Sequence, residues 1–225
     1  MTTIQLSTLP HPATNRRLLR NDIYETLVEC ILNGSLTPGY RLRDAELTQW
    51  LRVSRTPIRE ALARLMVVGL IHTEPNRYTI VAPLNVSEVR EAIEVLQLLL
   101  PHALRSSNFS APEKIRYQTT VILGTLEQED SRDSMIAFEQ ILTLVISGLD
   151  NPVLREAIDT AYLRFVRYFR LNPSPDPVLT RERVIALASA LRDGDAADEI
   201  GEILESALDA LGSERLQSDE REWIS

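Results

Sequence analysis

The chain has 225 residues, enough for one or two domains with buried cores, and its hydrophobic fraction of 44% and charged fraction of 25% are ordinary for a globular protein. It contains no charged-then-apolar leader and no apolar run near about 18 residues, so we expect a cytoplasmic protein that neither enters a membrane nor is secreted. Cys30 is the one cysteine, which excludes a disulfide within the chain and favours a buried, inert thiol.

The net charge of −8 is distributed unevenly along the chain. Residues 1–84 contain 10 arginines and 7 acids, a balance of +3, whereas residues 85–225 contain 14 basic and 25 acidic residues, a balance of −11. This asymmetry indicates two domains, of which only the first suits an anionic partner. Only Lys114 among the 24 basic residues is a lysine, so a general preference for arginine is not itself evidence of phosphate binding.

The first third of the chain begins with a stretch that lacks periodicity. We interpret residues 1–15 as a flexible tail and residues 16–32 as a first helix that ends at Asn33-Gly34. Thr37-Pro38-Gly39-Tyr40 is typical of a type II turn, with Pro38 fixing φ and Gly39 supplying a positive φ. Residues 44–51 then predict a short second helix, followed by a tight turn at residues 52–53.

A third helix is predicted from the segment RVSRTPIREALARL, residues 52–65. Arg55 and Arg59 are four residues apart and therefore share one face of this helix. Either Ser54 or Thr56 is placed to cap it, and Pro57 is tolerated because it lies in the first turn. The opposite face carries an apolar stripe at helical spacing, formed by Val53, Ile58, Ala61, Leu62 and Leu65.

After Gly69 the periodicity changes from helical to strand-like. Residues 70–73 and 78–81 predict two short strands around the turn at residues 74–77. Three helices followed by a hairpin predict a winged helix-turn-helix over residues 16–84.

The remainder of the chain predicts only helices, about six of them between residues 86 and 211. Their expected starts are Asn85 with Glu88, Ser110 with Glu113, Asn151-Pro152 and Asp176-Pro177, and their expected stops are Gly148, Gly194 and Gly212. Pro101 lies within one helix and is expected to kink it. The fold class is therefore mainly α, with an all-helical bundle over residues 85–212 and a C-terminal tail over residues 213–225.

The segment GSLTPGYRLRDAELTQWLRVSRTPIREALARLMVVGL resembles the DNA-binding domain of GntR-family bacterial transcription regulators, and the core VSRTPIREAL is a specific signal within about 60 residues. The helical remainder is similar in length to the FCD-type effector domain of the FadR subgroup. The resemblance implies that Ser54, Arg55, Thr56 and Arg59 face DNA, and that Arg43 reaches the backbone. Arginine reads guanine in the major groove, and short hydroxyls hold phosphates near a helix amino end.

Two positions depart from the family pattern in this first domain. Arg52 occupies the turn position where glycine is usual, which adds a candidate phosphate contact. Tyr78 replaces the wing glycine that usually follows Asn-Arg, and Arg77 is either a substitute minor-groove contact or a solvated tip. Arg64, late in the third helix, is better interpreted as a surface residue than as a DNA contact.

The helical domain departs further from the resemblance. Many members of the subgroup bind a divalent metal through three histidines and an acid, but Glu139, Val184 and Ser206 fall where those histidines are expected. We therefore expect no transition metal and no cofactor, because valine and serine cannot supply imidazole ligands. A ligand would be held by arginine or by apolar packing.

The candidate effector-binding residues are His102, Glu139, Arg164 and Arg167. A lone His102 is more often a satisfied or surface residue than a ligand. The run at residues 161–170 favours a structural helix, and its alternative is a helix from which Arg164 or Arg167 reaches an anionic ligand. The leucine-rich stretch at residues 96–100 indicates a core or subunit interface, with a pocket for an apolar effector as its alternative.

The function that these patterns favour is a regulator that binds a palindromic operator as a homodimer, with DNA affinity modulated by a small effector. An alternative keeps the regulator but uses the helical domain only for assembly. An enzyme is disfavoured, because no phosphate loop, catalytic triad or metal-ligand spacing is present in the sequence.

Overall fold

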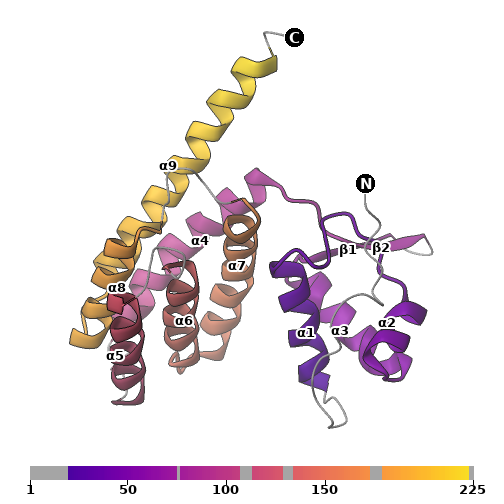
Figure 1. The fold of residues 1–225 in the computed structure, drawn as a ribbon, viewed down its shortest axis with the longest axis horizontal. Coiled ribbons are helices and arrows are strands. Elements are labelled where there is room, and N and C mark those ends of the chain that lie inside the picture. Colours follow the sequence, from indigo (N-terminus) through magenta and orange to yellow (C-terminus); the bar gives the residue numbers. More distant parts are fainter. Residues whose placement is uncertain (1–19, 75–76, 107–112, 129–133, 173–178, 223–225) are drawn as a thin grey trace. The chain divides into compact units, whose positions relative to one another are not determined.

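The structure is a computed structural model that describes residues 20–74, 77–106, 113–128, 134–172 and 179–222. The described part of the chain is mainly helical, with one small sheet (Figure 1). Its contacts divide it into two compact units. Unit 1 comprises residues 1–85 and 166–172, and unit 2 comprises residues 86–165 and 173–225. The expected tail at residues 1–15 lies outside the described residues.

Unit 1 contains the three predicted helices and the hairpin. The helices are α1 (Arg20–Leu32), α2 (Asp44–Leu51) and α3 (Arg55–Val67), and the strands are β1 (Ile71–Glu74) and β2 (Tyr78–Val81). Helix α3 packs against α1 and α2 through its apolar stripe, in which Ile58 and Leu65 are fully buried. The predicted bounds of α2 are confirmed, and residues 16–19 of the predicted first helix lie outside the described residues.

Two tight turns set the path of the chain in unit 1. Gly39 has φ +80°, and the N–H of Tyr40 donates to the carbonyl of Thr37 at 2.9 Å, which confirms the type II turn. Arg52 follows α2 in the left-handed conformation with φ 54°, and its N–H donates to the carbonyl of Thr48. Among the described residues, Arg52 is the one non-glycine residue with positive φ. This conformation turns the chain directly from α2 into α3.

The wing is an antiparallel hairpin in which Ile71 pairs with Val81 and Glu74 with Tyr78. The segment before α2 lies along the other edge of β2: Leu42 donates to the carbonyl of Thr79 at 2.8 Å. Ile71 and Val81 are buried, so the hairpin is anchored at the end that joins the helices. Residues 75 and 76 at its tip lie outside the described residues.

The last turns of helix α7 (Pro152–Leu171) belong to unit 1, although its earlier residues belong to unit 2. The buried guanidinium of Arg167 donates to the carbonyl of Ala82, just after β2. Arg170 forms an ion pair with Glu29 of α1, with an Nη1 to Oε1 distance of 3.1 Å. The sequence did not predict that a distant helix would complete the first domain.

Unit 2 is an all-helical bundle in the described part of the chain, and its six helices confirm the predicted number. Besides α7 they are α4 (Val86–Arg105), α5 (Glu113–Gln128), α6 (Ser134–Ser147), α8 (Arg181–Asp193) and α9 (Ala197–Glu222). Helix α4 packs along α9, and α5 packs against both α6 and α8 (Figure 1). Phe138 of α6 and Phe165 of α7 meet in the core, with ring centroids 5.8 Å apart.

The helix ends of unit 2 follow the capping signals at some positions and depart from them at others. Asn151 Oδ1 accepts hydrogen bonds from the N–H groups of Val153 and Leu154, and Pro152 is the first residue of α7, as predicted. Gly194 ends α8 in the left-handed conformation, with φ 94°. The predicted start at Pro177 is wrong, because α8 begins at Arg181 with Thr180 as its N-cap.

The predicted stop at Gly212 is also wrong, since α9 continues to Glu222. A single glycine within a helix costs only about 1 kcal/mol relative to alanine, and the following residues are mostly good helix formers. Helix α4 runs through Pro101 and ends at Arg105.

No described helix combines the length and the apolar character that crossing a bilayer requires.

Cys30 of α1 is half-buried, and this burial raises the pKa of its thiol to about 11. Because only the thiolate is nucleophilic, this thiol is protonated and unreactive at neutral pH, in agreement with its expected inert role.

Candidate functional site

Helix α3 separates an apolar face from a cationic one. Its buried face rests on α1 and α2, while Arg55, Thr56 and Arg59 are exposed on the side away from this core. Because the buried side chains fix the rotation of the helix about its axis, they also fix where both guanidinium groups project. The predicted candidates of this helix are thus presented together to solvent.

The amino end of α3 is suited to an anion. Ser54 is its N-cap in an extended conformation, and its hydroxyl makes no capping hydrogen bond. The first N–H groups of any α-helix have no intrahelical acceptor, so those of Arg55 and Thr56 are directed outward. These donors, the exposed hydroxyls of Ser54 and Thr56 and the positive end of the helix dipole together match a phosphate oxygen.

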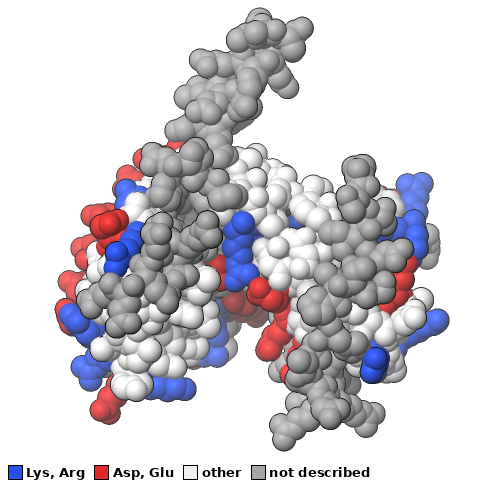
Figure 2. All heavy atoms as spheres, viewed as in Figure 1, with Lys and Arg blue, Asp and Glu red and all other residues white. Residues whose placement is uncertain are grey.

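Three of the predicted DNA-binding arginines form ion pairs within unit 1. Arg43 pairs with Glu46 at 2.8 Å and Arg77 with Glu74 at 3.2 Å, each within three residues along the chain. Arg59 of α3 pairs with an acid of α2: its Nε lies 3.0 Å from Oδ2 of Asp44. Figure 2 accordingly shows acidic atoms beside basic ones along the edge of unit 1. Exposed pairs of this kind contribute little stability, so their main effect is to orient the arginines.

Arg59 keeps donors for a further partner. Its Nε bond to Asp44 uses one of the five N–H groups of the guanidinium, and 70% of the side chain is exposed. For Arg52 and Arg55, the described residues provide no ion pair within 4.0 Å, and both side chains are exposed. Arg52 lies in the turn between α2 and α3, and Arg55 and Arg59 lie in the first two turns of α3.

The structure adds a residue that sequence reasoning missed. Arg41 donates from Nη2 to the backbone carbonyl of Arg77 at 2.8 Å, across 36 positions of sequence. This bond ties the segment before α2 to the wing near its tip. Arg64, by contrast, lies with its guanidinium carbon 3.8 Å from the centre of the Tyr24 ring. This stacking position in the α1–α3 packing agrees with the surface role expected for Arg64.

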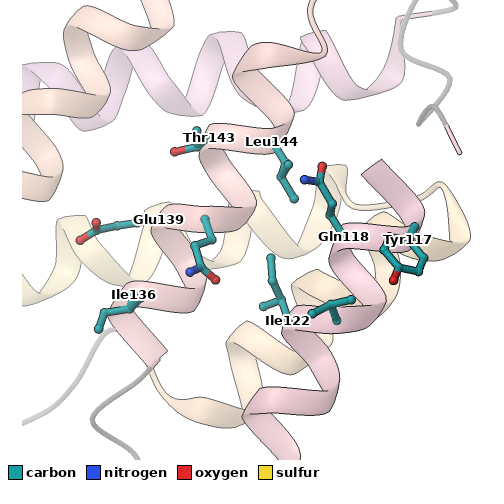
Figure 3. Close-up of a pocket in the computed structure, with 9 residues that line it drawn as sticks. Tyr117, Gln118, Ile122, Ile136, Glu139, Thr143 and Leu144 are labelled. Atoms are coloured by element: carbon teal, nitrogen blue, oxygen red, sulfur yellow. The ribbon is translucent and has the colours of Figure 1, made fainter. Parts of the chain in front are cut away.

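A second candidate site is a cavity of about 650 Å³ between α5 and α6 in unit 2, within the range of about 300–1,000 Å³ usual for ligand pockets (Figure 3). Of the four predicted effector-binding residues, only the buried Glu139 lines it. His102 is exposed on α4, and Arg164 donates to the carbonyl of Thr160 in its own helix. Arg167 is engaged in unit 1. The structure therefore does not bring the four residues into this cavity.

The residues at the expected metal positions do not fit a metal ion. Val184 is fully buried and has no donor atom, and the hydroxyl of Ser206 donates to the carbonyl of Glu202 in its own helix. In the described part of the chain, no group of three or more His, Cys, Asp or Glu side chains is placed to hold a metal. Glu139 is thus the one potential ligand at those three positions.

The arrangement of unit 1 defines the class of protein. A helix supported by two others, joined to the preceding helix by a tight turn and followed by an antiparallel hairpin, is a winged helix-turn-helix. Proteins with helix-turn-helix motifs generally place the second helix of the motif in a DNA groove.

Comparison with known proteins gives the family. Residues 19–81 match the profile of the bacterial regulatory proteins of the gntR family. The chain is 30% identical to the Nta operon transcriptional regulator of Aminobacter aminovorans, over 69% of this chain and 75% of that protein. It is 25% identical to the HTH-type transcriptional repressor RspR of Escherichia coli, over 93% of this chain and 91% of that protein. The solved structure of E. coli McbR/YncC has the same fold, with a TM-score of 0.64, 21% identity and coverage of 89% of this chain and 100% of that one.

The chain belongs to the GntR family of DNA-binding transcription regulators. Its relatives are regulators rather than enzymes, so the protein is not an enzyme.

Proposed function

We propose that this regulator is of the FadR subgroup and binds a palindromic operator as a homodimer, with the amino end of α3 in the major groove of each half-site. The observation that carries the proposal is the exposed cluster at that helix end, where Arg55, Thr56 and Arg59 project away from a buried stripe. A two-fold dimer presents this cluster twice, and half-sites about one helical turn of DNA apart then match it.

Each candidate residue has a distinct role in this proposal. Arg55 and Arg59 read base edges, and Ser54 and Thr56 hold a phosphate at the helix end. Arg43 and Arg52 contact the backbone on the α2 side, where exposure leaves both guanidinium groups accessible. Arg77 approaches the minor groove from the wing by its side chain, because Tyr78 replaces a small residue there.

Selection of bound duplexes from a random DNA library tests the operator. The expected result is an enriched inverted repeat bound by the full-length protein with nanomolar affinity and a strong dependence on salt. Enrichment of a single half-site, or of no sequence, contradicts the proposal. Sedimentation of the free protein at micromolar concentration is expected to show a dimer.

The domain arrangement in this proposal assigns DNA binding to residues 16–84, and dimerisation and effector binding to residues 85–212. The α5–α6 cavity of unit 2 supports an effector, since its volume suits a small molecule. An operator on the chromosome places the protein in the cytoplasm. In the alternative function, the helical domain serves assembly only. A thermal-shift screen of small molecules distinguishes the two, because only an effector-binding domain is stabilised by a ligand.

A further inference from the structure

The ion pair between Asp44 and Arg59 differs from the other ion pair of helix α2. Arg43 pairs with Glu46 only three positions away, so that pair stays at the start of one helix. The pair of Asp44 and Arg59 instead joins the first residue of α2 to the second turn of α3, across 15 positions of sequence. It therefore ties a side chain of the proposed recognition helix to a neighbouring helix.

Buried neighbours hold both ends of this pair in place. Leu47, one turn after Asp44, is fully buried, and so is Ile58, which precedes Arg59. Because these side chains fix the rotation of α2 and α3, they bring Oδ2 of Asp44 to 3.0 Å from Nε of Arg59. The Asp44 side chain is still 35% exposed and that of Arg59 is 70% exposed, so both remain accessible to a partner.

The hydrogen bond occupies one edge of the Arg59 guanidinium and leaves another edge open. Nε donates to Asp44, whereas Nη1 and Nη2 donate no hydrogen bond within the described part of the chain. These two terminal groups form the end of the guanidinium, and their N–H donors match O6 and N7 of guanine. An arginine held at Nε presents this end in fewer orientations than an unrestrained one, so it loses less conformational entropy when it contacts a base.

The charge of Asp44 opposes non-specific binding. A carboxylate on a surface that meets a polyanion repels phosphates, and beside Arg59 it offsets the attraction of that guanidinium for any phosphate oxygen. The donors at Nη1 and Nη2 stay available to a base, because Asp44 accepts from Nε. Specificity is a difference between two affinities, so an acid at this position lowers the affinity for other sequences more than the affinity for the operator.

We infer that Asp44 is a positioning residue for operator recognition: it holds Arg59 for an end-on contact with a guanine and weakens binding to other sequences. The inference rests on the proposed operator binding by α3 and specifies how one of its arginines reads a base. A purely structural ion pair predicts a different result, since its loss would change the affinity for every duplex alike.

Fluorescence anisotropy of the full-length protein tests the inference with three kinds of duplex. These are the selected operator, operators with one base pair changed in both half-sites, and a duplex of random sequence. Arg59→Ala first identifies the base pair that Arg59 reads, as the position at which discrimination is lost. Asp44→Ala is expected to reduce discrimination at that same base pair about two- to tenfold, the effect of a long side chain that must be ordered on binding. It is also expected to raise the affinity for the random duplex.

Glu46→Ala is the matched control. Glu46 lies on the same helix, has a similar side-chain exposure of 39% and pairs with Arg43, which is proposed to contact only the DNA backbone. This variant is expected to raise the affinity for the random duplex and to leave discrimination at the Arg59 base pair unchanged. A double variant of Asp44→Ala and Arg59→Ala is expected to lose no more discrimination there than Arg59→Ala alone, because Asp44 acts through Arg59.

Four results would overturn the inference: unchanged discrimination in Asp44→Ala, an equal loss at every base pair, the same loss in Glu46→Ala, or an unchanged affinity of Asp44→Ala for the random duplex. A greater loss in the double variant than in Arg59→Ala would also overturn it. Failure of the proposed function gives a different result, in which no inverted repeat is selected or Arg59→Ala keeps every base preference. Loss of a base preference in Arg59→Ala but not in Asp44→Ala would reject this inference and leave the proposed function intact.

Discussion

The candidate sites of units 1 and 2 have opposite character: one is an exposed cationic surface and the other is a mainly apolar hollow. In unit 1 the candidate residues stand on an exposed surface, and the apolar face of α3 beneath them is buried. In unit 2 the candidate site is a mainly apolar cavity between two helices, in a part of the chain whose net charge is negative. The difference matches the partners proposed for the two units: protruding cations can enter the grooves of a polyanion, whereas an apolar hollow suits a small molecule.

The two units also differ in the type of residue that ends a helix in the left-handed conformation. Arg52 at the end of α2 and Gly194 at the end of α8 both adopt the left-handed conformation, with φ 54° and 94°. Glycine adopts it without steric cost, while arginine does not. The proposed contact of the Arg52 guanidinium with the DNA backbone accounts for this steric cost, because position 52 adjoins the amino end of α3.

The largest expected effects come from the two cores. Ile58→Ala in unit 1 and Phe138→Ala in unit 2 remove fully buried side chains and are expected to lower the free energy of unfolding by about 2–5 kcal/mol. If each unit has its own core, hydrogen exchange followed by mass spectrometry accelerates chiefly in the unit that carries the change. Equal acceleration in residues 20–74 and 179–211 by Phe138→Ala would show that the units unfold together.

Loss of a base contact is expected to have the next largest effect. Arg55→Ala and Arg59→Ala should each weaken specific operator binding by about 1–3 kcal/mol and leave the circular dichroism spectrum unchanged, because both side chains are exposed. Fluorescence anisotropy of a labelled operator measures this. Arg192→Ala, an exposed arginine of unit 2, is the matched control and should bind as the unmodified protein does. Operator binding unaltered in both α3 variants would show that α3 is not the recognition helix.

Exchanging the residue types at the two left-handed positions, Arg52 and Gly194, sharpens the comparison further. Arg52→Gly should raise the free energy of unfolding by about 1 kcal/mol by removing left-handed strain, and it should weaken DNA binding. Gly194→Arg introduces the same strain in unit 2 and should lower the free energy of unfolding by a similar amount, without weakening DNA binding. Denaturant titration and anisotropy measure both quantities. Undiminished operator affinity in Arg52→Gly would remove Arg52 from the interface.

The smallest expected effect concerns the wing. Arg77→Ala should weaken operator binding slightly and reduce the slope of log K against log salt concentration by about 1, as expected when one cation fewer lies against the duplex at the minor groove. Arg77 is already paired with Glu74, so Glu74→Gln is a useful companion that should strengthen binding slightly. A salt slope unchanged by Arg77→Ala would identify Arg77 as a solvated tip.

The sequence alone determined most of unit 1. The bounds of α2, the type II turn at Gly39, the buried stripe of α3 and the hairpin all follow from signals within a few residues of one another: apolar periodicity, turn residues and caps. The grouping of Arg55, Thr56 and Arg59 at one helix end was predictable for the same reason, because they lie on one short helix and need no distant segment to bring them together. Their assignment to DNA came from the resemblance to the family.

Tertiary structure decided what depends on distant segments. The docking of Arg167 on Ala82, the tie between Arg41 and the Arg77 carbonyl, and the cavity shared by α5 and α6 join residues that no local pattern relates. The run at residues 161–170 showed a helix but not that its last turns complete unit 1. Glu139 was found by its position in the family pattern, but its apolar neighbours from α5 emerged only when packing fixed the rotation of both helices.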